Sequence, residues 1–344
     1  RNTEYNSDVL IVSHPDFLDA ARRLAEFRSE GLGLKVDYFD SEEIYKEFSY
    51  GRKSPHAIKD FAKNAYFNWQ NAPTHLIIIG DASWDARNVW LYTQMKDYVP
   101  SYGLPVSDFW FTLLEGDDRQ PEMIVGRIPA TTLKEANDYI DKLIEYDTTE
   151  VRPWNKMFLY LSGGITDLER ENFYDARFNW VEHILPRPIC ADTASVRKLD
   201  SLPVGETEAG EIRKFINAGA GWVNFFGHAS AQVFDMDGWQ VSELNNFGKY
   251  SVFTTLSCNS GAFAEAAVQC RNEEYIFEPR KGFIVTGGSS GIGSVFAERK
   301  LYTLMMDQMS RASHNKREFG AMLHGAKSQM YVKDDWEAIT VDQY

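Results

Sequence analysis

Cysteine is scarce in this chain: only Cys190, Cys258 and Cys270 occur among its 344 residues. Three cysteines are too few for a disulfide framework, and they lack the paired spacing of a zinc site. At least one thiol is therefore unpaired within the chain. A free cysteine attracts attention as a reactive group when it lies beside a base.

Long apolar runs are missing as well. No stretch approaches the roughly 20 apolar residues that cross a bilayer, so we expect no membrane insertion. The chain also does not start with a basic segment followed by an apolar one, the pattern of a secretory signal. Two explanations stay open at this point, an intracellular protein or one whose targeting peptide has been removed.

Basic residues are outnumbered, with 36 Lys and Arg against 50 Asp and Glu and a net charge of −14. Such a charge repels phosphate backbones and anionic lipid surfaces, so we expect no nucleic-acid partner. The hydrophobic fraction of 44% is that of a globular protein. The length allows two domains of ordinary size.

Apolar runs and amphipathic segments alternate along the chain, which predicts strands and helices in turn. The predicted strands are 8–13, 35–39, 74–80, 109–115, 123–128, 156–161, 221–226, 251–256 and 282–286. The predicted helices are 16–30, 54–69, 132–147, 168–185, 206–217, 294–310 and 317–331. The third of these opens with the capping box Thr132-x-x-Glu135.

The alternation is interrupted at Arg152-Pro-Trp154 and then begins afresh. We infer a domain boundary near residue 150, with one α/β subdomain over residues 1–150 and a second over residues 151–344. The predicted fold class is α/β, with two mostly parallel sheets flanked by helices.

A glycine-rich turn, Thr286-Gly-Gly-Ser-Ser-Gly-Ile-Gly293, follows the last predicted strand and resembles the nucleotide-binding turn of short-chain dehydrogenases. A dinucleotide fingerprint occupies the first β-α turn of its fold, with more strands after it. Here the turn comes at the end, and no Tyr-x-x-x-Lys pair follows. We favour a tight turn that leaves a buried strand, with a nicotinamide-binding oxidoreductase as the alternative.

Two late strands end in residues suited to nucleophilic catalysis. His228 follows the apolar run 222–226, and Cys258 follows the run 253–256. If the strands are parallel neighbours, both side chains meet at the edge of the sheet where open α/β folds bind ligands. The imidazole then moves protons while the thiolate attacks. A buried filler cysteine and a structural histidine are the alternatives, which their joint placement makes less attractive.

The motifs Phe226-Gly-His-Ala-Ser230 and Leu256-Ser-Cys-Asn-Ser-Gly-Ala-Phe263 resemble the active-site strands of the gingipain-like cysteine peptidases, family C25 of the caspase-like clan. The resemblance covers nearly the whole chain. Its earlier landmarks are Leu76-Ile-Ile-Ile-Gly-Asp81, Val106-Ser-Asp108, Leu114-Glu-Gly-Asp117 and Val125-Gly-Arg-Ile-Pro129.

The resemblance implies a catalytic unit of two subdomains, the second caspase-like, that acts on proteins or peptides. His228 would be the general acid/base and Cys258 the nucleophile that forms a thioester. The amides of Ala229 and Cys258 would stabilise the oxyanion, and the chemistry would need no cofactor. Some members place an acid beside the histidine just after the strand that reads Leu161-Ser-Gly-Gly164 here. This chain has none there, and Asp167 and Glu169 are the nearest candidates.

The resemblance also implies a substrate pocket and a calcium site. The loop after the last strand would wall the pocket through Ser289, Ser290 and Gly293, and we place Asp167 among the substrate-binding residues. No acid is clearly placed there to demand Arg or Lys. A structural calcium ion would be held by four positions, whose hard oxygen donors suit that ion; a solvated acidic surface is the alternative. These positions are Asp108, Glu115, the carbonyl of Phe263 and Glu274.

The sequence thus predicts a cysteine endopeptidase, secreted or at the cell surface, seen without its signal and pro-segments. Acyl transfer to an amine instead of water is the nearest variant. A catalytically silent surface protein on the same fold is a further alternative. The segment Asp235-Met-Asp237-Gly238 resembles a calcium loop faintly, but later ligands are missing and we predict a turn.

Overall fold

The computed structural model describes residues 5–186, 189–311, 318–330 and 335–344. Contacts within the chain divide it into two compact units. Unit 1 comprises Arg1–Asp141 and Phe263–Val268, and unit 2 comprises Lys142–Ala262 and Gln269–Tyr344. The division falls between residues 141 and 142, whereas the sequence pattern predicts a boundary near 150 and keeps 263–268 in the second subdomain.

Unit 1 is built on a parallel sheet with the strand order β2-β1-β3-β4. Strand β1 is buried along its whole length, as expected for a central strand covered on both faces. Residues 263–268 belong to this unit through backbone hydrogen bonds, such as the one from Trp84 N to Ala264 O of 2.9 Å. The strands are β1 (Val9–Ser13), β2 (Val36–Asp40), β3 (His75–Ile79) and β4 (Ile124–Ile128).

The helices of the first part of the chain begin and end at recognisable caps. The hydroxyl of Ser54 accepts a hydrogen bond from His56 N at the start of α3. The predicted capping box forms at the start of α4, with Glu135 N donating to Thr132 Oγ1 over 3.1 Å. Helix α1 passes through Gly31 and ends before Gly33, whose φ of 66° needs a glycine. These helices are α1 (Leu18–Leu32), α2 (Ser41–Ser49), α3 (Pro55–Asn68) and α4 (Leu133–Thr148).

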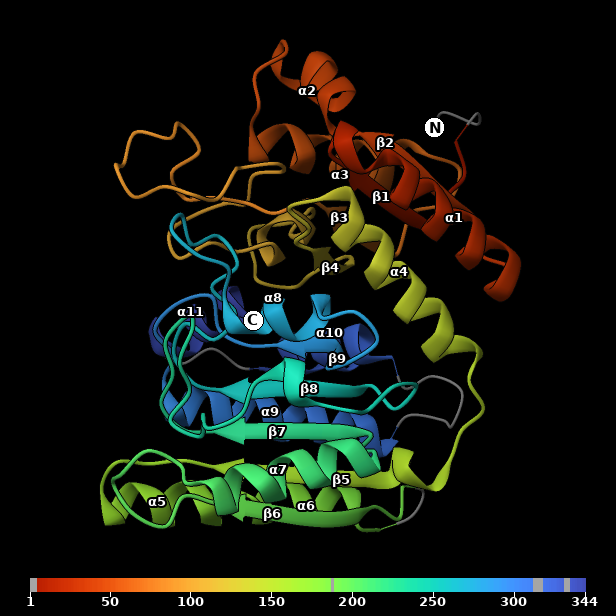
Figure 1. Ribbon diagram of the computed structural model, residues 1–344. Helices are drawn as coiled ribbons and strands as arrows, with labels where there is room; N and C mark the ends of the chain where they lie inside the picture. The colour runs from red at the N-terminus through yellow and green to blue at the C-terminus, as the bar shows by residue number, and fades with distance from the viewer. Residues whose placement is uncertain (1–4, 187–188, 312–317, 331–334) are drawn as a thin grey trace. The chain divides into compact units, whose positions relative to one another are not determined.

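Unit 2 contains a parallel sheet with the order β6-β5-β7-β8-β9. Every neighbouring pair is parallel, so the carboxyl ends of all these strands lie at one edge of the sheet (Figure 1). The strands are β5 (Met157–Ser162), β6 (Asp192–Arg197), β7 (Trp222–Phe226), β8 (Ser251–Leu256) and β9 (Phe283–Gly287).

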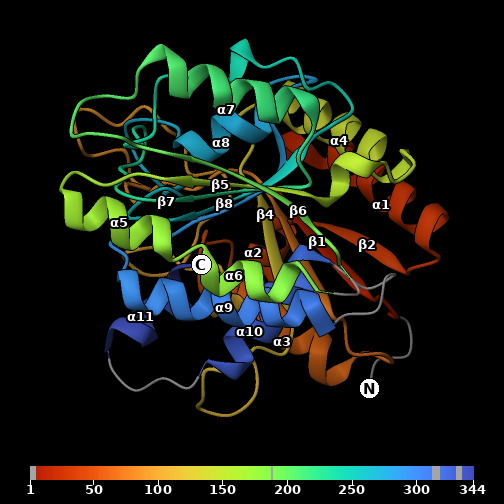
Figure 2. The ribbon, with the colours of Figure 1, turned by 90° about the horizontal axis from the view of Figure 1, so that it is seen from below.

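Helices cover both faces of this second sheet. Helices α7 and α8 lie on one face, and α6, α9 and α10 lie on the other (Figure 2). The bounds are α5 (Asp167–Asp175), α6 (Phe178–Ile184), α7 (Glu206–Ala218), α8 (Arg271–Phe277), α9 (Val295–Arg311), α10 (Phe319–Gln329) and α11 (Asp335–Gln343). None of the helices in the described part of the chain is both long enough and apolar enough to cross a bilayer.

A buried polar contact joins the two central strands β7 and β8. The hydroxyl of Thr254 accepts hydrogen bonds from Trp222 Nε1 (2.7 Å) and from Asn224 Nδ2 (2.9 Å), and all three residues are buried. Asn224 lies directly opposite Thr254 in the sheet. A slip of one residue would turn these side chains to opposite faces, so the contact fixes the register of the two strands.

Two predicted elements are wrong in kind or extent. Residues 109–115 do not form a strand: a 3₁₀ turn spans Phe109–Thr112, closed by local hydrogen bonds from Phe111 N to Asp108 O (3.1 Å) and from the Thr112 hydroxyl to Phe109 O (2.7 Å). The predicted helix 168–185 is divided into α5 and α6. At the break, the guanidinium of Arg177 donates to the carbonyl of Tyr174.

Four elements were not predicted: α2, β6, α8 and α11. Strand β6 is an edge strand whose sequence, Asp-Thr-Ala-Ser-Val-Arg, is mostly polar, so it lacks the apolar run that marks a buried strand. The remaining predicted strands and helices are confirmed within a few residues. The predicted helix 317–331 begins and ends outside the described residues, and α10 covers its middle.

We expect the substitution Thr254→Val to destabilise the protein by about 1–3 kcal/mol for each buried donor left without an acceptor. Valine has nearly the same shape, so lost hydrogen bonds rather than lost volume cause the effect. Urea unfolding measures the change. The control is Thr193→Val on the exposed edge strand β6, for which we expect a change within about 0.5 kcal/mol. Equal effects of the two substitutions would contradict the role of this contact.

Candidate active site

The carboxyl ends of β7 and β8 carry the two residues that the sequence singles out. Phe226 lies opposite Leu256 at the end of the paired region, and Gly227 N still donates to Leu256 O over 3.3 Å. His228 and Cys258 each follow two residues after that pair. Both residues therefore have the same offset from a directly paired position of two neighbouring parallel strands, so they follow these strands at the same level of the sheet. The same edge of the sheet therefore carries an imidazole and a thiol.

The loop after β7, residues 228–238, is called the histidine loop below. It folds back on itself through an antiparallel bridge between Ala229 and Phe234. Asp235 N donates to the carbonyl oxygen of His228 over 2.9 Å, which closes the turn directly behind the histidine. The backbone of His228 is thus held on both sides, while its side chain remains 45% exposed. An exposed, anchored imidazole can meet a substrate.

Glu169 lies beside the imidazole. Its Oε1 is 3.4 Å from His228 Nε2. Its other oxygen, Oε2, accepts hydrogen bonds from the amides of Ile165 and Thr166, each at 3.0 Å, and Thr166 completes a capping box at the start of α5. These backbone hydrogen bonds are the main reason that the pKa of Glu169 is lowered, and His228 adds to the effect. The carboxylate is therefore fixed and ionised where it meets the histidine.

A second carboxyl, that of Asp235, belongs to the histidine loop itself and binds the segment that follows β5. Its Oδ2 accepts a hydrogen bond of 2.6 Å from Gly164 N, at the end of β5, and burial raises its pKa. A Cβ atom on Gly163 or Gly227 would come within 1.9 or 2.4 Å of Asp235 Oδ1. Glycine is required at both positions because the carboxyl fills the space beside them.

The turn that carries Cys258 rests on the loop after β9. Asn259 N donates to Gly291 O (2.7 Å), and Gly261 N donates to Ser289 O (2.9 Å). The Sγ atom of Cys258 lies 4.0 Å from the carbonyl oxygen of Gly293, and the residue is partly exposed. The carbonyl groups of the glycine-rich stretch thus support the turn that carries Cys258.

The other two cysteines have different surroundings. Cys270 is fully buried, and burial raises the pKa of its thiol well above the ordinary value. Cys190 is exposed and has a positive φ of 51°. Of the three, only Cys258 lies at the carboxyl edge of the sheet next to the strand that ends in His228.

A buried acid lies beneath the same glycine-rich loop and escaped the sequence analysis. Glu298, in the first turn of α9, is 1% exposed, and its Oε1 is 3.0 Å from the hydroxyl of Tyr344. That hydroxyl donates to Thr255 O over 2.7 Å. Burial raises the pKa of Glu298 to about 8, so the neutral acid is favoured at neutral pH. A Cβ on Gly293 would lie 1.9 Å from the same carboxyl.

The predicted substrate-binding residues have unequal exposure. Ser289 and Ser290 are buried, and the hydroxyl of Ser289 donates to Gly291 O and to Gln343 Oε1. Gly293 is partly exposed, and the carboxylate of Asp167 is almost wholly exposed and pairs with Arg170. The assignment of these residues to a substrate pocket stays a prediction.

The predicted calcium ligands are divided between the two units. In unit 1, both carboxylate oxygens of Asp108 are bound by Arg127, while Glu115 is exposed. In unit 2, Glu274 is bound by Arg271 at 2.8 Å. Phe263, whose carbonyl was the fourth ligand, packs in a small apolar cluster of unit 1. No group of three or more His, Cys, Asp or Glu side chains that could hold a metal forms among the described residues. The calcium site stays a prediction.

Sequence and structure comparisons add independent findings. The profile of peptidase family C25 matches residues 2–343. The crystal structure of the Arg-specific cysteine proteinase gingipain R (RgpB) has a TM-score of 0.76 at 16% identity, over 100% of this chain and 77% of that one. The complex of Porphyromonas gingivalis RgpB pro- and mature domains has a TM-score of 0.74 at 16% identity, over 97% and 77%. None of the curated protein sequences compared with the chain matches it.

The structural match identifies the fold class as α/β, with two mostly parallel sheets flanked by helices, as predicted. Gingipain R shares this fold. The family follows from the profile match. The chain belongs to peptidase family C25 and is a cysteine-type peptidase. The glycine-rich turn is accordingly part of a peptidase fold, and the alternative of a nicotinamide-binding oxidoreductase is set aside.

We expect Glu298→Gln to change how stability depends on pH. The folded protein binds the Glu298 proton more tightly than the unfolded chain, whose pKa is near 4.5, so wild-type stability falls as the pH rises from about 4.5 to about 8. The neutral variant escapes this loss, which is on the order of 1.4 kcal/mol per pH unit. Urea unfolding between pH 5 and 9 measures the difference. For the control Glu211→Gln, whose side chain is exposed, we expect the plot of unfolding free energy against pH to run parallel to that of the wild type. A parallel plot for Glu298→Gln as well would contradict a buried neutral acid.

Proposed function

We propose that the protein is a cysteine endopeptidase in which Cys258 attacks the substrate carbonyl and His228 acts as general acid/base. The observation that carries the proposal is the matched departure of these residues from the paired strands β7 and β8. The imidazole takes the thiol proton, and the thiolate adds to the carbonyl carbon to form a tetrahedral intermediate. Collapse of the intermediate breaks the C–N bond, His228 gives the proton to the leaving amine, and a thioester remains. Water then releases the product.

Glu169 completes the site by orienting the imidazole. Because Oε1 faces Nε2, the carboxylate accepts the Nε2–H and leaves Nδ1 as the basic nitrogen that takes the thiol proton. The resulting order of acid, base and nucleophile follows the logic of catalytic triads. Of the two acids that the sequence offers, the geometry favours Glu169, because Asp167 is engaged by Arg170.

Two backbone amides are suited to bind the developing oxyanion, those of Ala229 and Cys258. In the part of the chain that the structure describes, neither amide donates a hydrogen bond to another group. The neighbouring amides of Ser230 and Asn259 are both used within the chain. Free amides beside the nucleophile are the donors that such an intermediate needs, and each is worth about 3 kcal/mol in the transition state.

The proposal also covers the substrate, which is a protein or peptide, and the residues that contact it. Gly293 and Asp167 have the exposed surface to meet a substrate, while Ser289 and Ser290 support the loop from below. The loop residues beside the nucleophile are small and uncharged, which favours a pocket without a strict demand for Arg or Lys. Cleavage only after basic residues in a varied peptide library would contradict this specificity.

We further propose that the enzyme is exported and made as a precursor with a pro-segment. Support comes from a structural relative, RgpB of Porphyromonas gingivalis, whose pro- and mature domains form a complex. A calcium ion bound through Asp108, Glu115, Phe263 and Glu274 would be structural. No step of the reaction above uses it.

We expect a peptidyl acyloxymethyl ketone to modify Cys258 alone, because that reagent requires an activated thiol next to a histidine. Intact-mass and peptide mass spectrometry locate the adduct, and Cys258→Ala removes it. The exposed Cys190 is an internal control: it reacts with iodoacetamide in both proteins but not with the ketone. A folded protein that gains no adduct would support the catalytically silent alternative, and an adduct at Cys190 would show that reactivity follows exposure.

We expect Glu169→Gln to lower kcat by about 10²-fold, since the amide cannot stabilise the imidazolium that forms during attack. KM should change little, because the carboxylate faces the histidine rather than the pocket. Steady-state assays on a fluorogenic peptide measure both constants. The control is Glu171→Gln, two residues away on the same helix, whose exposed carboxylate pairs with Arg197 and not with the histidine, and for which we expect kcat to stay within about 3-fold. Equal losses in both variants would remove Glu169 from the reaction.

A further inference from the structure

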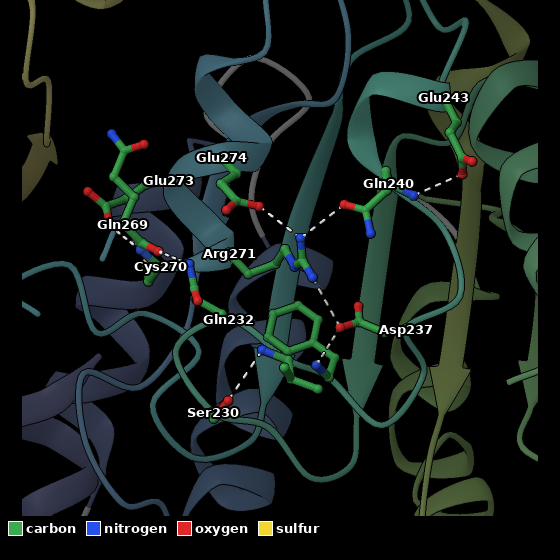
Figure 3. Close-up of polar contacts among 12 residues, drawn as sticks. Ser230, Gln232, Asp237, Gln240, Glu243, Gln269, Cys270, Arg271, Glu273 and Glu274 are labelled. Carbon is green, nitrogen blue, oxygen red and sulfur yellow. Dashed lines mark hydrogen bonds and ion pairs between the residues drawn. The ribbon is translucent and has the colours of Figure 1, made fainter. Parts of the chain in front are cut away.

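Arg271, the first residue of helix α8, lies at the centre of a polar cluster away from the reacting atoms (Figure 3). Its side chain is 13% exposed. Nη1 donates to Glu274 Oε2 at 2.8 Å and to Gln240 Oε1 at 3.2 Å, and Nη2 donates to Asp237 Oδ2 at 3.2 Å. One guanidinium therefore serves two carboxylates and an amide oxygen.

Arg271 binds the histidine loop at two points. Its side chain binds Asp237 near the end of the loop, and its backbone amide donates to the carbonyl oxygen of Ala231 over 2.6 Å. Gln232 Nε2 adds a longer contact of 3.4 Å to the carbonyl oxygen of Gln269, two residues before Arg271. The start of α8 and the histidine loop are thus fastened together along several residues (Figure 3).

A short path of hydrogen bonds connects this cluster with the imidazole. The carboxylate of Asp237 that binds Arg271 also accepts from Phe234 N over 3.0 Å. Phe234 is the bridge partner of Ala229, and the next residue donates to the carbonyl oxygen of His228. Loss of the guanidinium would leave two partly buried carboxylates without their cation and would loosen the bridge on which the backbone of His228 depends.

The identity of the partners makes the cluster informative. Glu274 is one of the positions where the family resemblance implies a calcium ligand, and Asp237 belongs to the segment with a faint likeness to a calcium loop. Both carboxylates converge on the same guanidinium. Arginine offers a permanent charge and a rigid fork of donors, so it can hold two acids without a metal.

From this arrangement, and resting on the proposed function, we propose that Arg271 is a positioning residue for His228. Its guanidinium is a built-in cation that ties the histidine loop to α8, where a calcium ion would otherwise be needed for these carboxylates. Arg271 does not touch the substrate. It sets the distance between the imidazole and the thiol by holding the loop in place.

The test compares Arg271→Gln with the matched control Arg213→Gln. Arg213 also belongs to unit 2, is 19% exposed and pairs with two carboxylates, Glu206 and Glu243, but it has no bond to the histidine loop. We expect Arg271→Gln to lower kcat by about 10²-fold with little change in KM, the loss typical of a misplaced catalytic group. Arg213→Gln should keep kcat within about 3-fold.

Two further readouts separate positioning from general stability. Guanidinium ion, added at a concentration too low to unfold the protein, should restore part of the kcat of Arg271→Ala and leave Arg213→Ala unchanged. Arg271→Lys, which keeps the charge and loses the fork, should fall between wild type and Arg271→Gln. Wild-type kcat in a folded Arg271→Gln, or an equal loss in both arginine variants, would overturn the proposal.

Two controls keep the outcome unambiguous. If Arg271→Gln does not fold, Asp237→Asn breaks one link alone, and wild-type kcat in that variant would overturn the proposal. Labelling of wild-type Cys258 by the acyloxymethyl ketone distinguishes failure of the proposed function from failure of this inference.

Discussion

The hydroxyl of Thr254 is the contact on which the site depends. It accepts hydrogen bonds from Trp222 Nε1 and Asn224 Nδ2 across the two neighbouring strands β7 and β8. A shift of the strand register by one residue would break both hydrogen bonds. His228 and Cys258 then follow the paired ends of these two strands at the same edge of the sheet. A polar contact inside an apolar sheet contributes modest net stability but strong specificity, since buried donors are costly to leave unpaired.

The two loops that follow these strands are held by different means. The histidine loop is secured by side-chain carboxylates, those of Asp235 and Asp237, which bind a backbone amide of β5's end and a guanidinium of α8. The turn with Cys258 is secured by backbone hydrogen bonds to the loop after β9. Glycines at 163 and 227 leave room for a carboxyl, so the small residues of the Gly-His motif have a steric cause. Catalytic groups positioned by such rigid supports keep their geometry during the reaction.

Much of this arrangement could be predicted from the sequence, because buried parallel strands are continuous apolar runs and their carboxyl ends coincide. The sequence pattern did not predict β6, because an edge strand is partly exposed and does not need a continuous apolar run. Residues 109–115 were wrongly predicted as a strand, because aromatic side chains can enter the core from a 3₁₀ turn as well. The choice of Glu169 over Asp167 depends on the capping box of α5. Its Thr-x-x-Glu spacing can be recognised in the sequence, but the sequence does not show that the Glu169 carboxylate faces His228. Glu298 gave no signal, since only packing reveals that an acid in an amphipathic helix faces inward.

The segment 263–268 has a further consequence. It belongs to unit 1, yet it is flanked by Ala262 and Gln269 of unit 2, so the polypeptide passes between the units on either side of it as well as inside α4. Neither unit can be excised by a single cut, and a fragment ending near residue 150 would lack part of the first unit. The few residues that join Cys258 to this segment therefore link the turn after β8 covalently to unit 1.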